Sequence, residues 1–257
     1  MRLLTGLATP NNGTYSLFGI DYKDRNVYEV RKDISAIVEA ISIVPSFTAF
    51  ENLKMASLYY GVTPQKNYDE LLKRVGLEGV GKKKAKNFSL GMKQRLGIAI
   101  LLLNNPKLMF LDEPMNGLDP SGIASLRELI IDLNHQGITF VISSHILSEL
   151  EKVATHYGFI SHGRMLKEIS STDLANECKK GIELRYSDID LLVSKLKQIG
   201  IENIQLLPNG VKVLDDIKLL DLLTKLKDEG IEINDVKTID ENVEDYYLHL
   251  VRNGGIK

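Results

Sequence analysis

The spacing of hydrophobic positions changes several times along the chain. Between residues 48 and 104, apolar positions such as Phe50, Leu53, Ala56 and Tyr60 recur at helical spacing. Thr48 and Glu51 have the spacing of a capping box. The pattern therefore predicts a mostly helical region over 48–104, with helices beginning near residues 48, 67–69 and 89.

Two short apolar runs with a different pattern follow, over 108–111 and 138–142. Helical patterns lie between and after them, over 121–136 and 146–155. Apolar strands that alternate with helices predict a parallel sheet buried on both faces, in which ligands lie at the carboxyl ends of the strands. One run ends in Asp112 and Glu113, and the other is followed by His145.

The last part of the chain has a third pattern. Residues 157–168 resemble a hairpin that turns at His162 and Gly163, and residues 181–251 predict a βαββαβ order with a final helix. Acidic residues outnumber basic ones over 181–257, unlike in the preceding part. We expect an α/β domain over 1–175 and a small α+β, ferredoxin-like accessory domain over 181–257, whose role the sequence leaves open.

Composition narrows the class of protein. Hydrophobic residues make up 44% and charged residues 26%, which is typical of folded domains. The net charge of −2 indicates no nucleic-acid partner, and the single cysteine excludes an internal disulfide. No signal peptide or membrane-spanning run is predicted.

Asp112 and Glu113 carry the strongest chemical signal. A buried strand that ends in two adjacent carboxylates can hold Mg²⁺ with one and polarise a water molecule with the other, as in a Walker B motif. A charged strand end facing solvent is the alternative. Asp119, which precedes Pro120, suits a helix N-cap.

A second candidate site lies upstream, at the start of the helix predicted from residue 89. Ser89 offers a hydroxyl and free backbone N–H groups, and Gly91 permits close approach of a ligand, so this helix start suits a phosphate. Taken alone, the segment fits an ordinary capped core helix better than a phosphate site. A lone histidine such as His145 is also more often structural than catalytic.

The order of these segments resembles the nucleotide-binding subunit of an ABC transporter. The matching segments are Ser-Leu-Gly-Met-Lys-Gln-Arg (89–95), Leu-Asp-Glu-Pro (111–114), Gly-Leu-Asp-Pro (117–120) and Ser-Ser-His (143–145). The resemblance implies a P-loop NTPase-like fold with a helical subdomain at about 48–104. It also implies roles for single residues: Ser89 and Gly91 in the signature motif, Asp112 as Walker B aspartate, Glu113 as catalytic base, Asp119 in the D-loop and His145 as switch histidine.

Glu39 stands where most members of that family have glutamine. Glu39, Met92 and the Glu244–Leu248 segment resemble the bacitracin- and lantibiotic-type exporters and immunity transporters. By this resemblance Glu39 would ligate Mg²⁺ together with Asp112. Its alternative is an ordinary exposed loop acid.

The family's Walker A string, G-x-x-x-x-G-K-[ST], is absent from the 257 residues. Residues 1–7 resemble the helix that follows this string, so we expect a fold that is incomplete at the N-terminus. A wrongly assigned start, a fragment and a genuine loss are the open explanations.

The resemblance implies an ATPase that uses ATP and Mg²⁺ and drives export of, or resistance to, a peptide or amphiphilic compound. Its partners would be a membrane permease and a second ATP-binding subunit in a head-to-tail dimer. The protein would lie in the cytoplasm, on the inner face of the plasma membrane. The alternative is a truncated, ATPase-dead subunit that supplies only the signature motif to an intact partner. A soluble ABC ATPase of DNA repair or translation fits less well, because neither a coiled-coil insertion nor a second such domain is present.

Overall fold

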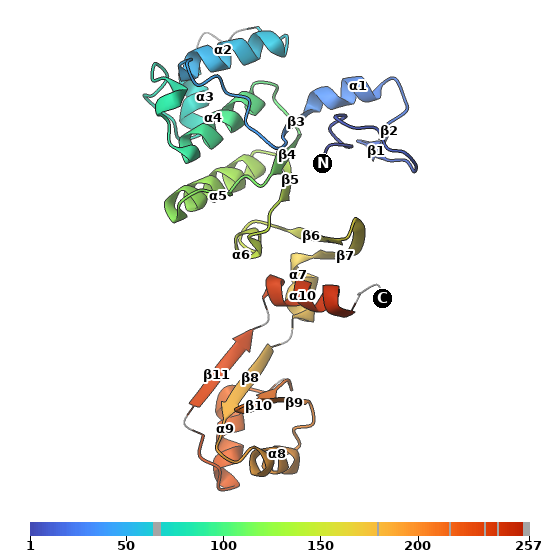
Figure 1. Cartoon of the computed structure of the whole chain (residues 1–257), viewed down its shortest axis with the longest axis vertical. Helices are drawn as coiled ribbons and strands as arrows, with labels where there is room; N and C mark the ends of the chain where they lie inside the picture. Colours follow the sequence, from blue (N-terminus) through green and yellow to red (C-terminus); the bar gives the residue numbers. More distant parts are fainter. Residues whose placement is uncertain (64–67, 179, 216, 234, 241, 254–257) are drawn as a thin grey trace. The chain divides into compact units, whose positions relative to one another are not determined.

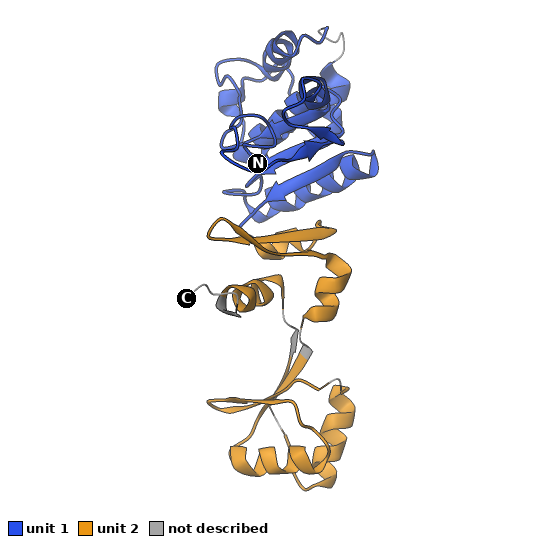
Figure 2. Cartoon of the chain, turned by 90° about the vertical axis from the view of Figure 1, so that its right-hand side faces the viewer, with its two compact units in different colours: residues 1–146 blue, residues 147–257 orange. Residues whose placement is uncertain are grey.

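The computed structural model describes residues 1–63, 68–178, 180–215, 217–233, 235–240 and 242–253. The chain divides into two compact units, residues 1–146 and 147–257 (Figure 2). Among the described residues, no helix combines the length and the apolar character needed to cross a bilayer.

Unit 1 contains a three-stranded parallel sheet in the order β3-β4-β5 (Figure 1). Its strands are β3 (Ile34–Ile37), β4 (Leu108–Asp112) and β5 (Thr139–Ser143). The central strand is the most buried, with Met109, Phe110 and Leu111 at most 1% exposed. The predicted α/β class with a parallel sheet is confirmed. Burial on both faces is found for β4, whereas β5 exposes Thr139 and Val141, so this part of the prediction is wrong for β5.

Helices α2 (Ala49–Tyr59), α3 (Tyr68–Arg74), α4 (Leu90–Leu102) and α5 (Pro120–His135) form one hydrophobic core with this sheet. The short helix α1 (Val27–Val30) precedes β3 and runs into a 3₁₀ turn at Arg31–Asp33, and a second 3₁₀ turn lies at Ala85–Asn87. Helix α4 packs against α2, α3, α5 and β3. The Thr48–Glu51 capping box is formed in full, which explains why α2 begins where the sequence predicts.

The first residues differ from the prediction of a short helix. Residues 2–6 form turns that end at Gly6 (φ 81°), because so short a segment cannot offset the cost of helix nucleation. Residues 16–21 form a small hairpin of β1 (Ser16–Leu17) and β2 (Ile20–Asp21) that turns at Phe18 and Gly19.

Unit 2 contains the predicted hairpin and a C-terminal helix that packs on it. The elements are α6 (Leu147–Leu150), β6 (His156–Ser161), β7 (Arg164–Ser170), α7 (Ser171–Glu177) and α10 (Val243–Asn253). Tyr157 and Phe159 of β6 share a core with Tyr246 of α10. The helix expected over 146–155 stops after one turn.

The rest of unit 2 is a four-stranded antiparallel sheet in the order β11-β8-β10-β9 with two helices. It consists of β8 (Lys180–Arg185), α8 (Ile189–Gln198), β9 (Ile204–Leu207), β10 (Gly210–Val213), α9 (Leu219–Asp228) and β11 (Asp235–Asp240). This is the βαββαβ arrangement that the sequence predicts, and it has a separate core that includes Leu184, Leu196 and Leu226. The domain boundaries at 175 and 181 stay predictions.

Candidate functional site

The candidate site lies in unit 1, at the carboxyl ends of β4 and β5. Asp112 ends β4 and is in register with Ser143, the last residue of β5. Glu113 follows with a φ of 48°, and its N–H donates to the Ser143 carbonyl oxygen at 3.1 Å. A positive φ is unfavourable for a residue other than glycine, so the surroundings hold Glu113 in a strained conformation.

Glu113 and His145 form a direct side-chain pair. The His145 Nδ1 atom lies 2.8 Å from the Glu113 Oε2 atom. Glu113 is about one-third exposed and His145 is well exposed, so the pair borders solvent. The structure thus brings together two side chains from separate loops that the sequence singles out independently.

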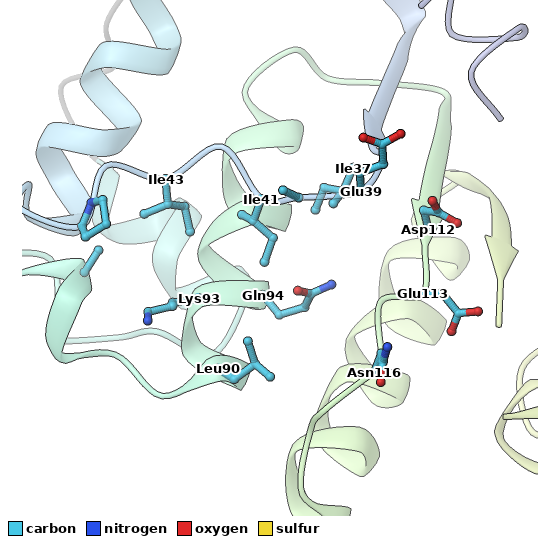
Figure 3. Close-up of a pocket in the computed structure, with 13 residues that line it drawn as sticks. Ile37, Glu39, Ile41, Ile43, Leu90, Lys93, Gln94, Asp112, Glu113 and Asn116 are labelled. Atoms are coloured by element: carbon cyan, nitrogen blue, oxygen red, sulfur yellow. The ribbon is translucent and has the colours of Figure 1, made fainter. Parts of the chain in front are cut away.

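A cavity of about 450 Å³ lies beside these strand ends. Its wall includes the three acids Glu39, Asp112 and Glu113, and the amide of Gln94 points from α4 toward the strand end that carries Asp112 (Figure 3). The rest of the wall is mostly apolar and consists of Ile37, Ala40, Ile41, Ile43, Pro45, Ala85, Leu90, Lys93 and Asn116. Glu39 has a φ of 69° and forms an exposed ion pair with Arg2 at 3.2 Å.

Ser89, Gly91 and Asp119 lie outside the cavity wall. Ser89 caps α4 by accepting a hydrogen bond from the Met92 N–H, and Asp119 caps α5 by accepting one from the Gly122 N–H. The nearest neighbour of a side chain at Gly91 would be the Leu118 Cδ2 atom, at 3.7 Å. The predicted caps are confirmed, and the start of α4 adjoins the 117–119 loop.

The carboxylates at the cavity can supply only part of the coordination sphere of a metal ion, so they suit a cation that is also bound by a ligand such as a nucleotide. Within the described ranges, no cluster of three or more His, Cys, Asp or Glu side chains could hold a metal ion. Asp112 and Glu39 supply two carboxylates at most, and Asp112 already accepts a hydrogen bond from Ser143 on Oδ1. Mg²⁺ is commonly bound by one or two carboxylates together with water and substrate phosphates, so these residues fit a magnesium–nucleotide complex.

Sequence reasoning missed Ser143, Gln94 and Asn116. Ser143 had a usable signal, because it is a polar residue at a strand end beside a candidate histidine. Gln94 lies in the signature segment and is only 7% exposed. A polar side chain on a helix is usually expected to face solvent, so the sequence did not indicate this burial. Asn116 becomes a wall residue only through the turn after Glu113.

The comparisons with known proteins agree with this geometry. A family model described as ABC transporter matches residues 1–116. The bacitracin transport ATP-binding protein BcrA of Bacillus licheniformis is 38% identical over 260 residues, covering 100% of this chain and 85% of BcrA. The lantibiotic transport ATP-binding protein SrtF of Streptococcus pyogenes is 44% identical over 168 residues, covering 65% of this chain and 71% of SrtF.

A solved structure of the ATP binding subunit of an ABC transporter superposes with a TM-score of 0.57 and 27% identity, covering 68% of this chain and 74% of that one. The similarity in sequence spans the whole chain, and the superposition covers its larger part. These findings confirm the family resemblance. The chain therefore belongs to the ATP-binding proteins of ABC transporters, a family of ATPases.

Proposed function

We propose that this protein hydrolyses ATP to drive export of, or resistance to, a peptide or other amphiphilic compound through a separate membrane permease. The observation that carries the proposal is the Glu113–His145 pair beside Asp112, at the carboxyl ends of two parallel strands. The similarity to BcrA and SrtF, whose names refer to bacitracin and lantibiotic transport, supports the substrate class.

Each residue of the cavity has a role in this proposal. Glu113 orients the attacking water, and His145 holds the Glu113 carboxylate and contacts the γ-phosphate of ATP. Asp112 and Glu39 serve Mg²⁺, which when bound neutralises charge on the phosphates. The Arg2 guanidinium offsets the extra negative charge of Glu39.

Ser89, Gly91 and Asp119 act between subunits in this proposal. They lie outside the cavity wall of their own chain, and a capped helix start without an acidic residue in its first turn suits an anion. We place them against the γ-phosphate held by a second ATP-binding subunit in a head-to-tail dimer. Through the permease, the dimer would lie on the cytoplasmic face of the plasma membrane.

The test uses the full-length protein assembled with its membrane partner. Glu113→Gln removes the carboxylate and keeps the size of the side chain, so we expect ATP hydrolysis to fall by about 10²-fold or more. Glu70→Gln, an exposed acid of α3, is the matched control and should leave the rate unchanged. Equal rates in Glu113→Gln and in the wild type would refute the proposal.

The second candidate function is that of a subunit that only supplies its signature segment to a partner. It is favoured by the position of Ser89 and Gly91 outside the cavity wall, at a capped helix start without an acidic residue in its first turn. In that case Ser89→Arg abolishes the hydrolysis measured in the assembled complex, whereas Glu113→Gln has no effect. Loss of hydrolysis in both variants supports the first function.

A further inference from the structure

Ser143 lies where the two strand ends of the candidate site meet. Its hydroxyl donates a hydrogen bond to the Asp112 Oδ1 atom and accepts one from the Glu113 N–H at 3.2 Å. The Ser143 carbonyl oxygen accepts from the same N–H at 3.1 Å. Ser143 of β5 therefore contacts both Asp112, the last residue of β4, and Glu113, which follows it.

We propose that Ser143 is a positioning residue for ATP hydrolysis, which fixes the carboxylate of Asp112 and the backbone of Glu113 through its hydroxyl group. The inference rests on the proposed function, since it assigns these two acids to the cation and to the attacking water. In this proposal Ser143 acts through the two acids and is not itself a ligand of the cation or of the attacking water.

The geometry gives the hydroxyl two separate tasks. By donating to Oδ1, it fixes the plane of the Asp112 carboxylate and leaves Oδ2 available to a cation ligand sphere. By accepting from the Glu113 N–H, it helps to hold the positive φ from which the Glu113 side chain reaches His145. Residues that orient the ligands of a metal commonly change metal affinity or activity by about 10-fold to 100-fold when they are removed.

A strand end does not by itself require this hydroxyl. Ser143 is only partly buried, and a β-branched apolar residue would suit the β-strand equally well. Instead, both the donor and the acceptor capacity of the hydroxyl are used by the two acids. This double use distinguishes a positioning role from mere strand pairing.

The test compares Ser143→Val with Ser143→Thr, because valine and threonine have nearly the same shape and differ in the hydroxyl. Both variants are made in the full-length protein and assembled with its membrane partner. We expect Ser143→Val to need about 10-fold more Mg²⁺ for half-maximal ATP hydrolysis and to have a lower kcat. Ser143→Thr should stay within about 2-fold of the wild type, since it keeps the donor and the acceptor.

A second measurement does not depend on hydrolysis. In the nucleotide-free protein, the Glu113 amide should exchange its hydrogen faster in Ser143→Val than in Ser143→Thr, with equal exchange in the core of β4. Equal Mg²⁺ dependence of the two variants overturns the inference, and so does equal exchange of the Glu113 amide. If the wild type does not hydrolyse ATP, the proposed function fails and the exchange measurement alone decides whether Ser143 holds Glu113.

Discussion

At the scale of single residues, buried polar groups decide how the cavity wall is held. Asn52 is fully buried on α2. Its Oδ1 accepts from the Val44 N–H at 2.8 Å, and its Nδ2 donates to the carbonyl oxygens of Val44 and Thr48 at 3.2 and 2.9 Å. This side chain fastens the segment that carries the wall residues Ile43 and Pro45 to the helix.

Asn52→Ala should lower the free energy of unfolding by about 2–4 kcal/mol, because the Val44 N–H and carbonyl groups lose their side-chain partner and the Thr48 carbonyl loses one of its two donors. Denaturant unfolding measures the change. Asn176→Ala, at an exposed position of α7, is the matched control and should stay within about 0.5 kcal/mol of the wild type. A loss for Asn52→Ala no larger than that of the control would show that the segment is held by other contacts.

At the scale of elements, helix α4 presents glycines with opposite surroundings. A Cβ atom at Gly97 would lie 2.6 Å from the Ile41 Cγ2 atom and 3.2 Å from the Ile37 Cδ1 atom, both in side chains of the cavity wall. At Gly91 the nearest atom would be at an ordinary contact distance of 3.7 Å. Gly97 is therefore required for packing, whereas Gly91 is free of that requirement.

Gly97→Ala should destabilise the protein by about 1–3 kcal/mol in denaturant unfolding, because Ile41 and Ile37 must move. Gly91→Ala should be neutral or stabilising by up to about 1 kcal/mol, since alanine favours the helix. If Gly91 faces a nucleotide on a second subunit, Gly91→Ala nevertheless reduces ATP hydrolysis in the assembled complex. Destabilisation by Gly91→Ala would contradict this division of roles.

In unit 2, a polar cluster of Lys167, Glu177 and Tyr246 joins β7, α7 and α10. Lys167 of β7 contacts both carboxylate oxygens of Glu177 at 2.6 and 2.7 Å, and the Tyr246 hydroxyl of α10 donates to Glu177 at 2.5 Å. The hydrogen bond from Lys167, followed by that from Tyr246, lowers the pKa of Glu177 below its ordinary value of 4.5. A lowered pKa in the folded state means that the ionised carboxylate stabilises the fold.

The stabilisation by Glu177 is complete above pH 4.5 and is lost as the pH falls through the lowered pKa. We therefore expect Glu177→Gln to melt at a lower temperature than the wild type at neutral pH. The difference should shrink below pH 4.5 in thermal unfolding followed by circular dichroism. Glu168→Gln, at an exposed acid of the same hairpin, is the matched control and should melt at the wild-type temperature at neutral pH. A difference for Glu177→Gln that is constant with pH would contradict the role of the charge.

At the scale of the whole molecule, the ferredoxin-like sheet has the topology of an insertion. Its first and last strands along the chain, β8 and β11, are adjacent and antiparallel, with Lys180 in register with Asp240. Helix α10, which follows β11, packs with β6, β7 and α6, which precede β8. We propose that residues 181–240 form the accessory domain and that α10 returns to the preceding part of unit 2.

Replacing residues 181–239 by two glycines should therefore leave the rest of the chain folded, because register partners lie only about 5 Å apart. The excised segment has its own buried core, and we expect it to fold alone. Circular dichroism of both pieces checks this. Unchanged ATP hydrolysis and dimerisation after the replacement would exclude a regulatory or dimer-stabilising role for the domain. Loss of the α10 aromatic packing would contradict an insertion.

Much of this architecture follows from local rules in the sequence. The caps at Thr48, Ser89 and Asp119 form as predicted, because N-cap hydrogen bonds join residues only three positions apart. The predicted helix over residues 146–155 is wrong beyond its first turn. Isolated helical segments of this length are marginal, so their extent depends on packing that spacing does not reveal.

The candidate site divides in the same way. The sequence by itself determined the family, the identities of Asp112, Glu113 and His145, and their position at the ends of apolar strands, because residue type and the spacing of hydrophobic positions are local properties. Only the tertiary structure decided that His145 pairs with Glu113, that Ser143 contacts both acids and that Arg2 pairs with Glu39. The physical reason is that these contacts depend on strand register and on the backbone conformation of Glu113 and Glu39, which long-range packing sets.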